Sequence, residues 1–286
     1  MRCMIRIMLL NALPFKKPLK RITLSLLGSA SLFSALLSAP AIAASPHKFE
    51  DNMAQRTLAC TACHGPQGRA APDGFYPRLA GKPAGYLFNQ LINFRDGRRN
   101  YALMSQLISP LSDDYLLEIA EYFSTLDIPY PAPLPANGSN ELRNQGERLV
   151  LKGDKARQIP ACVQCHGQAM TGVAPNIPGL LGLPRDYLNS QLGAWKTGQR
   201  KAHAPDCMKH VVERLSSDDI NAIGSWLAAQ PLPANTHAVR QRPPLPVGEK
   251  AIECGSAPLA AALAAVPTTV GEATISKASM IAKAKP

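Results

Sequence analysis

The chain has 286 residues, and 31 Lys and Arg face 20 Asp and Glu, which gives a formal charge of +11. Its 46% apolar and 18% charged residues are typical of a globular protein and exclude a wholly disordered chain. The length suits one large domain or two ordinary ones. An excess of basic residues of this size favours an anionic partner such as nucleic acid. Whether this prediction holds depends on where in the chain the basic residues lie.

The first 43 residues have the pattern of a secretory signal peptide. They carry six basic residues and no acidic one, continue with an uncharged run from Ile22 to Leu37, and end in a small-x-small site at Ala41–Ala43. We predict a cleaved signal peptide over residues 1–43 and export to the periplasm. A membrane anchor is the alternative, although this run is short for a span. Without these residues 25 Lys and Arg face 20 Asp and Glu, so we predict no nucleic-acid partner.

The rest of the chain contains one unit twice. The sequence CTACHG at Cys60–Gly65 recurs as CVQCHG at Cys162–Gly167, 102 positions later. The segment Tyr86–Leu91 matches Tyr187–Leu192 at nearly the same spacing. Further matched pairs are Pro77 with Pro178, Phe94 with Trp195, Arg99 with Arg200, Met104 with Met208, and Ser112 with Ser216. These matches indicate a tandem duplication of a unit of roughly 85 residues.

The composition between and after the two copies sets the predicted boundaries. We expect a first domain over residues 46–128 and a second over 141–230, called below the first and second repeat. Alternating prolines predict a stiff, extended linker over residues 129–140. The Pro- and Ala-rich residues 231–286 are expected to form a largely disordered tail.

Each repeat is predicted to be helical, with strands at most minor. Apolar residues recur three and four positions apart, and serines followed by acidic residues can cap two of the helices. The expected helices are Phe49–Leu58, Tyr86–Arg95, Glu141–Lys152 and Tyr187–Lys196, with two more that start at Ser112 and Ser216 and run to about Leu126 and Ala229. The predicted fold class is therefore all-α.

The repeated Cys-x-x-Cys-His motif is typical of covalent haem attachment. Two thiols three positions apart on a helical turn can reach the two vinyl groups on one side of the porphyrin, and the adjacent histidine then faces the iron. A thioredoxin-like redox pair and a zinc site are the alternatives, but the first does not explain the histidine and the second would use both cysteine pairs jointly. We predict two covalently bound haem c groups, held by Cys60, Cys63 and His64 and by Cys162, Cys165 and His166.

Each iron then needs a second axial ligand from its own repeat. Met104 is the only methionine between His64 and the linker, and Met208 lies at the matching distance after His166. A thioether ligand is soft and raises the iron potential. The predicted iron ligands are His64, Met104, His166 and Met208, with His203 and His210 as competitors for the second iron. Met170 lies too close to His166 to reach the opposite face.

Two cysteines remain once the haem cysteines and Cys3 of the signal peptide are set aside. Cys207 lies directly before Met208, and Cys254 lies in the tail. In an oxidising compartment two leftover cysteines usually pair. We expect a Cys207–Cys254 disulfide, with free thiols or cysteine ligation as the alternatives.

These residues resemble the bacterial dihaem class I cytochromes c of the cytochrome c4 type over about residues 50–230. The resemblance implies two small helical haem domains that face one another, His/Met ligation, and electron transfer in the periplasm. It also implies that the backbone carbonyls of Pro77 and Pro178 hold the second nitrogen of each axial histidine. Four further residues either reach the haem propionates or pack in the core: Tyr86, Gln90, Tyr187 and Gln191. The tail and Cys207 depart from the family pattern.

The expected function is electron transfer without catalysis. The predicted donors are a periplasmic dehydrogenase or a quinol-oxidising complex, and the predicted acceptor is a terminal oxidase; peripheral membrane association stays open. A dihaem peroxidase is the alternative from another class, but it needs an iron with an open position, and the matched methionines argue against one. An electron-transfer subunit bound to a periplasmic dehydrogenase is the second alternative.

Overall fold

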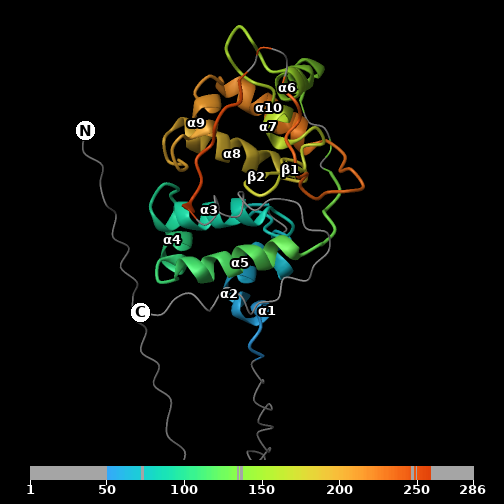
Figure 1. Ribbon diagram of the computed structural model, residues 1–286. Helices are drawn as coiled ribbons and strands as arrows, with labels where there is room; N and C mark the ends of the chain where they lie inside the picture. Colours follow the sequence, from blue (N-terminus) through green and yellow to red (C-terminus); the bar gives the residue numbers. More distant parts are fainter. Residues whose placement is uncertain are drawn as a thin grey trace, which may run out of the picture. The chain divides into compact units, whose positions relative to one another are not determined.

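The computed structural model describes residues 50–71, 74–133, 135, 138–245, 248 and 250–258 (Figure 1). The predicted signal peptide over residues 1–43, three residues of the linker and residues 259–286 lie outside the described residues. Helices dominate the described part, and the strands are limited to one short pair. No helix in these ranges is both long and apolar enough to cross a bilayer.

The first repeat is built around one pair of packed helices. Its elements are α1 (Met53–Arg56), α2 (Leu58–His64), the 3-10 turn η1 (Pro66–Gly68), α3 (Ala84–Arg95), α4 (Ala102–Ile108) and α5 (Asp113–Thr125). Helix α3 packs against both α4 and α5. Phe88 on α3 and Leu116 and Phe123 on α5 are fully buried, so they form the centre of this core.

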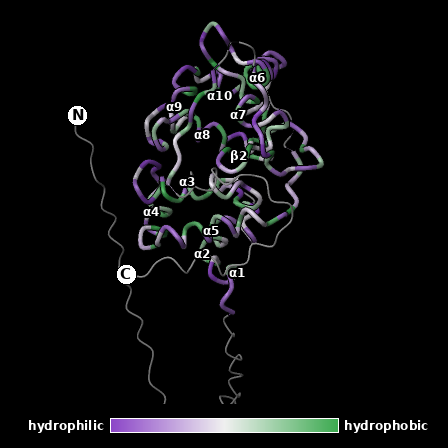
Figure 2. Tube along the Cα trace, in the orientation of Figure 1, coloured by the Kyte–Doolittle hydropathy of each residue, from purple (hydrophilic) through white to green (hydrophobic). Residues whose placement is uncertain are grey.

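The second repeat has a similar order of helices and adds a short pair of strands. Its elements are α6 (Asn140–Lys152), α7 (Cys162–His166), the antiparallel strands β1 (Gly172–Val173) and β2 (Ile177–Pro178), α8 (Arg185–Lys196), α9 (Cys207–Val212) and α10 (Ser217–Ala228). Helix α10 packs on α6 and α8. Much of α6 is polar, as its purple colour in Figure 2 shows, and its buried Leu149 and Val150 join the core.

Most helices match the sequence-based prediction because their apolar periodicity follows the face that is buried. The helices expected near Tyr86–Arg95, Glu141–Lys152 and Tyr187–Lys196 are confirmed as α3, α6 and α8. The single helix expected over Phe49–Leu58 is wrong. The chain breaks at the buried Thr57, whose hydroxyl donates to the carbonyl of Met53, and a new helix begins there.

Both predicted serine caps are present. The Ser112 side chain accepts the backbone N–H of Tyr115 and starts α5. Ser216 starts α10 in a reciprocal capping box: its side chain accepts the N–H of Asp219, while the Asp219 carboxylate accepts the N–H of Ser216. Such caps satisfy N–H groups that have no partner within the helix.

The close packing of α6 on α10 depends on Gly146. A Cβ at this position would overlap the carbonyl oxygen of Ala222 and lie 2.8 Å from Cβ of Trp226. We expect Gly146→Ala to destabilise the second repeat by about 1–3 kcal/mol despite the better helix propensity of alanine. Gly193→Ala on α8 is the matched control, because nothing lies within 4 Å of its added Cβ, and it should stabilise by about 0.5–1 kcal/mol. Urea unfolding of both variants checks this pair, and equal effects would contradict the packing argument.

The chain after Gln230 was expected to be a largely disordered tail, but its described part makes specific contacts. Val239 pairs with β1: its N–H donates to the carbonyl of Gly172 at 3.0 Å, and its carbonyl accepts from Ala174 N–H at 2.8 Å. Further on, Ala257 is buried in the core of the first repeat. Alanine and proline composition did not reveal these contacts because backbone pairing and a disulfide supply them.

Candidate functional site

The first Cys-x-x-Cys-His motif presents a neutral histidine. Helix α2 ends at His64, where Gly65 takes a positive φ of 75° and turns the chain. The His64 ring is 6% exposed, and its Nδ1 donates to the carbonyl of Pro77 at 2.8 Å. Burial lowers the pKa of His64, and the bond to Pro77 only partly opposes this shift. A neutral imidazole that donates from Nδ1 keeps the Nε2 electron pair for a metal.

The second motif repeats this geometry. His166 ends α7, is 7% exposed, and donates from Nδ1 to the carbonyl of Pro178 at 2.8 Å. Burial again lowers its pKa, and the charges of Lys82 and Arg242 lower it further. The predicted hydrogen bonds from the two histidines to the proline carbonyls are thus confirmed. A histidine held in one tautomer by a backbone carbonyl is the arrangement expected of a metal ligand.

Three of the motif cysteines have a pKa above the ordinary value of a thiol. Burial raises the pKa of Cys60 and Cys165, and it raises the pKa of Cys162 to about 12. A redox-active pair or a zinc ligand would need a thiolate at neutral pH. No group of three or more His, Cys, Asp or Glu in the described residues could hold a metal ion. Thiols with a raised pKa do not favour a thioredoxin-like redox pair, whereas thioether attachment needs no stable thiolate.

One cavity of about 1110 Å³ brings the predicted site residues of both repeats together. This volume is above the ~300–1,000 Å³ typical of a site for one small molecule. Aromatic and aliphatic side chains make up much of its wall, as suits a large flat apolar ring system. The predicted residues that line it are Cys60, His64, Met104, Cys162, Cys165, His166 and Met208. The remaining member of the motifs, Cys63, is exposed and does not line it.

The two methionines face this cavity from matching helices. Met104 lies on α4 and Met208 on α9, and each is partly buried against the core of its own repeat. Met170, in contrast, is buried in the second core and does not line the cavity. Of the competing histidines, His210 is exposed, and His203 reaches the cavity with Arg98 Nη2 3.2 Å from its Nε2. The Arg98 guanidinium therefore lies against the ring nitrogens through which His203 would have to bind an iron.

Two arginines at matching positions join the repeats across the cavity. Arg99 and Arg200 form an antiparallel bridge, and their guanidiniums cross-link the two repeats. Arg99 donates to the side-chain oxygens of Gln90 at 3.0 Å and Gln191 at 2.6 Å. Arg200 donates to the same two oxygens at 2.8 and 2.7 Å. Self-complementary pairing of this kind is what a two-fold interface requires.

This arginine pair has no carboxylate partner among the described residues. Arg200 is 4% exposed, and burial together with the charge of Arg99 lowers its pKa to about 10. Buried charges are costly unless an opposite charge compensates them. Each arginine also lies over an aromatic ring of its own repeat, Phe94 or Trp195. The cavity therefore offers an apolar wall with a cationic centre, which fits a haem with its propionates.

Lys82 breaks the symmetry of the two repeats. It lies in the first repeat, is 5% exposed, and donates from Nζ to the carbonyl of Gly179 in the second repeat at 3.0 Å. Burial, together with the charge of Arg78, lowers its pKa to about 8. The matching position of the second repeat holds Leu183. Lys82 thus places a buried cation next to the Pro178 loop that orients His166.

Sequence reasoning missed Arg99, Arg200 and Lys82 as functional residues. The two arginines could have been found, because they match at the repeat spacing beside the matched aromatic residues Phe94 and Trp195. Lys82 left no such signal, since its role depends on its contact with Gly179, which lies 97 positions further along the chain in the other repeat. The predicted Cys207–Cys254 disulfide is present and is described below.

The helical fold and the paired motifs define a class I c-type cytochrome. A curated relative named "Thiosulfate dehydrogenase electron acceptor" from Thiomonas intermedia is 43% identical over 174 residues, which is 60% of this chain and 79% of the relative. A "Cytochrome c4" from Pseudomonas aeruginosa is 33% identical over 174 residues, 60% of this chain and 84% of the relative. The crystal structure of reduced recombinant cytochrome c4 from Pseudomonas stutzeri matches with a TM-score of 0.53 and 31% identity, over 62% of this chain and 96% of that chain.

The chain belongs to the cytochrome c4 family of dihaem class I cytochromes. No protein-family model matches it. Members of this family carry covalently bound haem c and transfer electrons rather than catalyse a reaction. The predicted class of function, electron transfer, is therefore confirmed, and both the free carrier and the dehydrogenase subunit agree with it.

Proposed function

We propose that this protein binds two haem c groups and passes electrons from a periplasmic thiosulfate dehydrogenase to a respiratory acceptor. The observation that carries the proposal is the repeated arrangement in which a buried histidine, held at Nδ1 by a proline carbonyl, shares a cavity with a matched methionine. Cys60, Cys63 and His64 would hold the first haem, with Met104 as its second axial ligand. The matching residues of the second repeat are Cys162, Cys165, His166 and Met208.

The residues that line the cavity suit a site for one-electron transfer. When bound, each haem iron supplies a couple between Fe(III) and Fe(II). His64 and Met104, and in the second repeat His166 and Met208, would serve as the iron ligands, which would leave no open position for a substrate. Arg99 and Arg200 would offset the negative charge of the propionate carboxylates, and the apolar wall would keep water from the irons. These features favour a carrier over a peroxidase.

The donor is proposed from the relatives. The first two relatives are named electron acceptors of thiosulfate dehydrogenase, at 43% and 36% identity. Export through the predicted signal peptide would place the protein in the compartment where c-type haem is attached and such a dehydrogenase works. Membrane contact, where it occurs, would be peripheral.

The test mixes the oxidised holoprotein with a purified thiosulfate dehydrogenase and follows haem reduction after thiosulfate is added. We expect both haems to be reduced, at a rate that depends on dehydrogenase concentration, and no reduction when the dehydrogenase is left out. Reduction by dithionite confirms that the same sample is competent. Full reduction by dithionite with none by the dehydrogenase would contradict the proposed donor.

Lys82 gives a prediction about pH. Below pH about 8 Lys82 is charged and favours the reduced iron, so the potential of the second haem should fall as the pH rises through about 8. Lys82→Leu, which copies the second repeat, should lower that potential at pH 7 by on the order of 50 mV and remove the fall. Lys152→Leu, at an exposed lysine, is the control. Potentiometric titration at several pH values measures the reduction potentials of both haems. A shift confined to the first haem would contradict the proposal that Lys82 acts on the second haem.

A further inference from the structure

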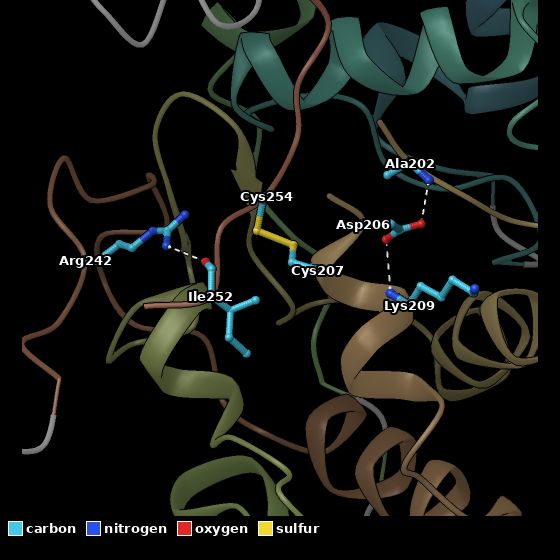
Figure 3. Close-up of a disulfide and its surroundings, with 7 residues drawn as sticks. All are labelled: Ala202, Asp206, Cys207, Lys209, Arg242, Ile252 and Cys254. Atoms are coloured by element: carbon cyan, nitrogen blue, oxygen red, sulfur yellow. Dashed lines mark hydrogen bonds between the residues drawn. A yellow bond between two sulfur atoms is a disulfide. The ribbon is translucent and has the colours of Figure 1, made fainter. Parts of the chain in front are cut away.

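The segment Cys254–Ala257, called here the strap, touches the loop that presents Met208. Cys254 forms a disulfide with Cys207, the residue directly before Met208 (Figure 3). The next residue, Gly255, donates its N–H to the carbonyl of Pro205 at 2.8 Å. The backbones approach so closely there that a Cβ on Gly255 would overlap the carbonyl oxygen of Ala204. Two successive residues of the strap therefore hold the segment that leads into α9.

The other end of the strap is anchored in the first repeat. Ala257 is 1% exposed and belongs to the core that α3 and α5 build. Its N–H donates to the side-chain oxygen of Asn89 on α3 at 2.7 Å. Only three positions separate this anchor from the disulfide. The start of α9 in the second repeat is thus tied to the core of the first.

Helix α9 lacks a side-chain hydrogen bond that ties its counterpart α4 to the neighbouring helix. Both helices are far shorter than the roughly 12–15 residues at which a helix becomes stable by itself. In the first repeat, Ser105, directly after Met104, donates from its hydroxyl to the carbonyl of Phe94 at 2.9 Å and fastens α4 to α3. The matching residue of the second repeat is Lys209, whose side chain is exposed and pairs with Glu213. Lys209 does not make that bond, because its ammonium points to Glu213 instead.

The remaining side-chain hydrogen bonds of α9 are local, although its fully buried Val212 packs in the core of the second repeat. Asp206 accepts the N–H of Lys209 at 3.0 Å and that of Ala202 at 2.7 Å, as Figure 3 shows. These bonds fix the beginning of the helix relative to its own loop. They do not reach another helix, so apolar packing on α8 and on the second core is what else holds α9 to its repeat.

We infer that the strap positions Met208 as a ligand of the second iron, in place of the serine tie of the first repeat. Cys254 and Ala257 are positioning residues in this account, because they act on Met208 through Cys207 and α9. The inference rests on the proposed ligation by Met208. It gives the C-terminal segment a role in electron transfer: the strap keeps the methionine on the iron and fixes it relative to the first repeat.

The test follows the far-red absorption band of methionine-bound Fe(III) as the pH is raised, in the full holoprotein carrying Met104→Ala, so that only the second haem contributes. Cys207→Ser together with Cys254→Ser removes the disulfide without leaving a lone thiol. We expect the equilibrium constant for loss of the methionine to rise about tenfold or more. Adding Lys209→Ser should restore part of the lost stability, because it recreates the tie of Ser105.

A second variant ends the chain after Gly255, which keeps the disulfide and removes the anchor at Ala257. It should also weaken the band, and it keeps the inference testable if the cysteine variant does not fold. An unchanged pH midpoint in a folded variant of either kind would overturn the inference. Met208→Ala in the same background must abolish the band. If the band survives Met208→Ala, the proposed ligand is wrong, and this failure is distinct from a failure of the strap.

Discussion

Met104→Ala is expected to open one iron and leave the other unchanged. The variant should lose roughly half of the far-red band, because one of two irons loses its sulfur ligand, and the reduced protein should bind about one carbon monoxide per two haems. The reason is structural: Met104 and Met208 reach the shared cavity from separate helices, each held by its own core. Optical titration with carbon monoxide measures the stoichiometry.

The matched control for Met104→Ala is Met170→Leu. Met170 is a buried methionine of the second core that does not line the cavity, so its replacement should leave the band and ligand binding unchanged. Equal ligand binding at both haems of Met104→Ala would mean that the two repeats do not hold their irons separately.

Arg200→Gln is expected to lower the reduction potentials of both haems. It removes a buried positive charge that lies at the junction of the repeats, where it bonds Gln90 and Gln191. Loss of that charge favours Fe(III), and we expect a drop on the order of 50–100 mV, which corresponds to about 1–2 kcal/mol for a one-electron couple. Potentiometric titration of the holoprotein gives both midpoints.

Lys201→Gln serves as the control for Arg200→Gln. It removes the same charge one position further along, from an exposed side chain, and water should screen it almost completely. If Lys201→Gln and Arg200→Gln shift the potentials equally, the effect comes from net charge alone. That result would contradict the proposed interaction of the arginine pair with the propionates.

The repeat explains why much of this structure was accessible from sequence. A motif that occurs once can arise by chance, but Met104 and Met208, and Pro77 and Pro178, were found because duplication placed them at matching positions. The histidine bonds to the two prolines then appeared as expected. The long helices could be predicted because each buries one continuous face.

The features that escaped prediction are those that depend on contacts between the repeats. The crossed bonds of Arg99 and Arg200 and the reach of Lys82 into the second repeat need a tertiary arrangement that periodicity does not encode. The short helices α4 and α9 escaped because six or seven residues carry too little periodicity. The contact of Ala257 escaped because this residue is buried by the core of the first repeat rather than by its neighbours in sequence.

The central claim is that the chain holds two haems, each with a histidine and a methionine, and transfers electrons without catalysis. The most direct measurement combines the oxidised and reduced optical spectra of the holoprotein with a peroxide turnover assay on the same sample. We predict two low-spin haems, a far-red band in the oxidised form and negligible turnover. A high-spin haem together with rapid peroxide reduction would contradict the account.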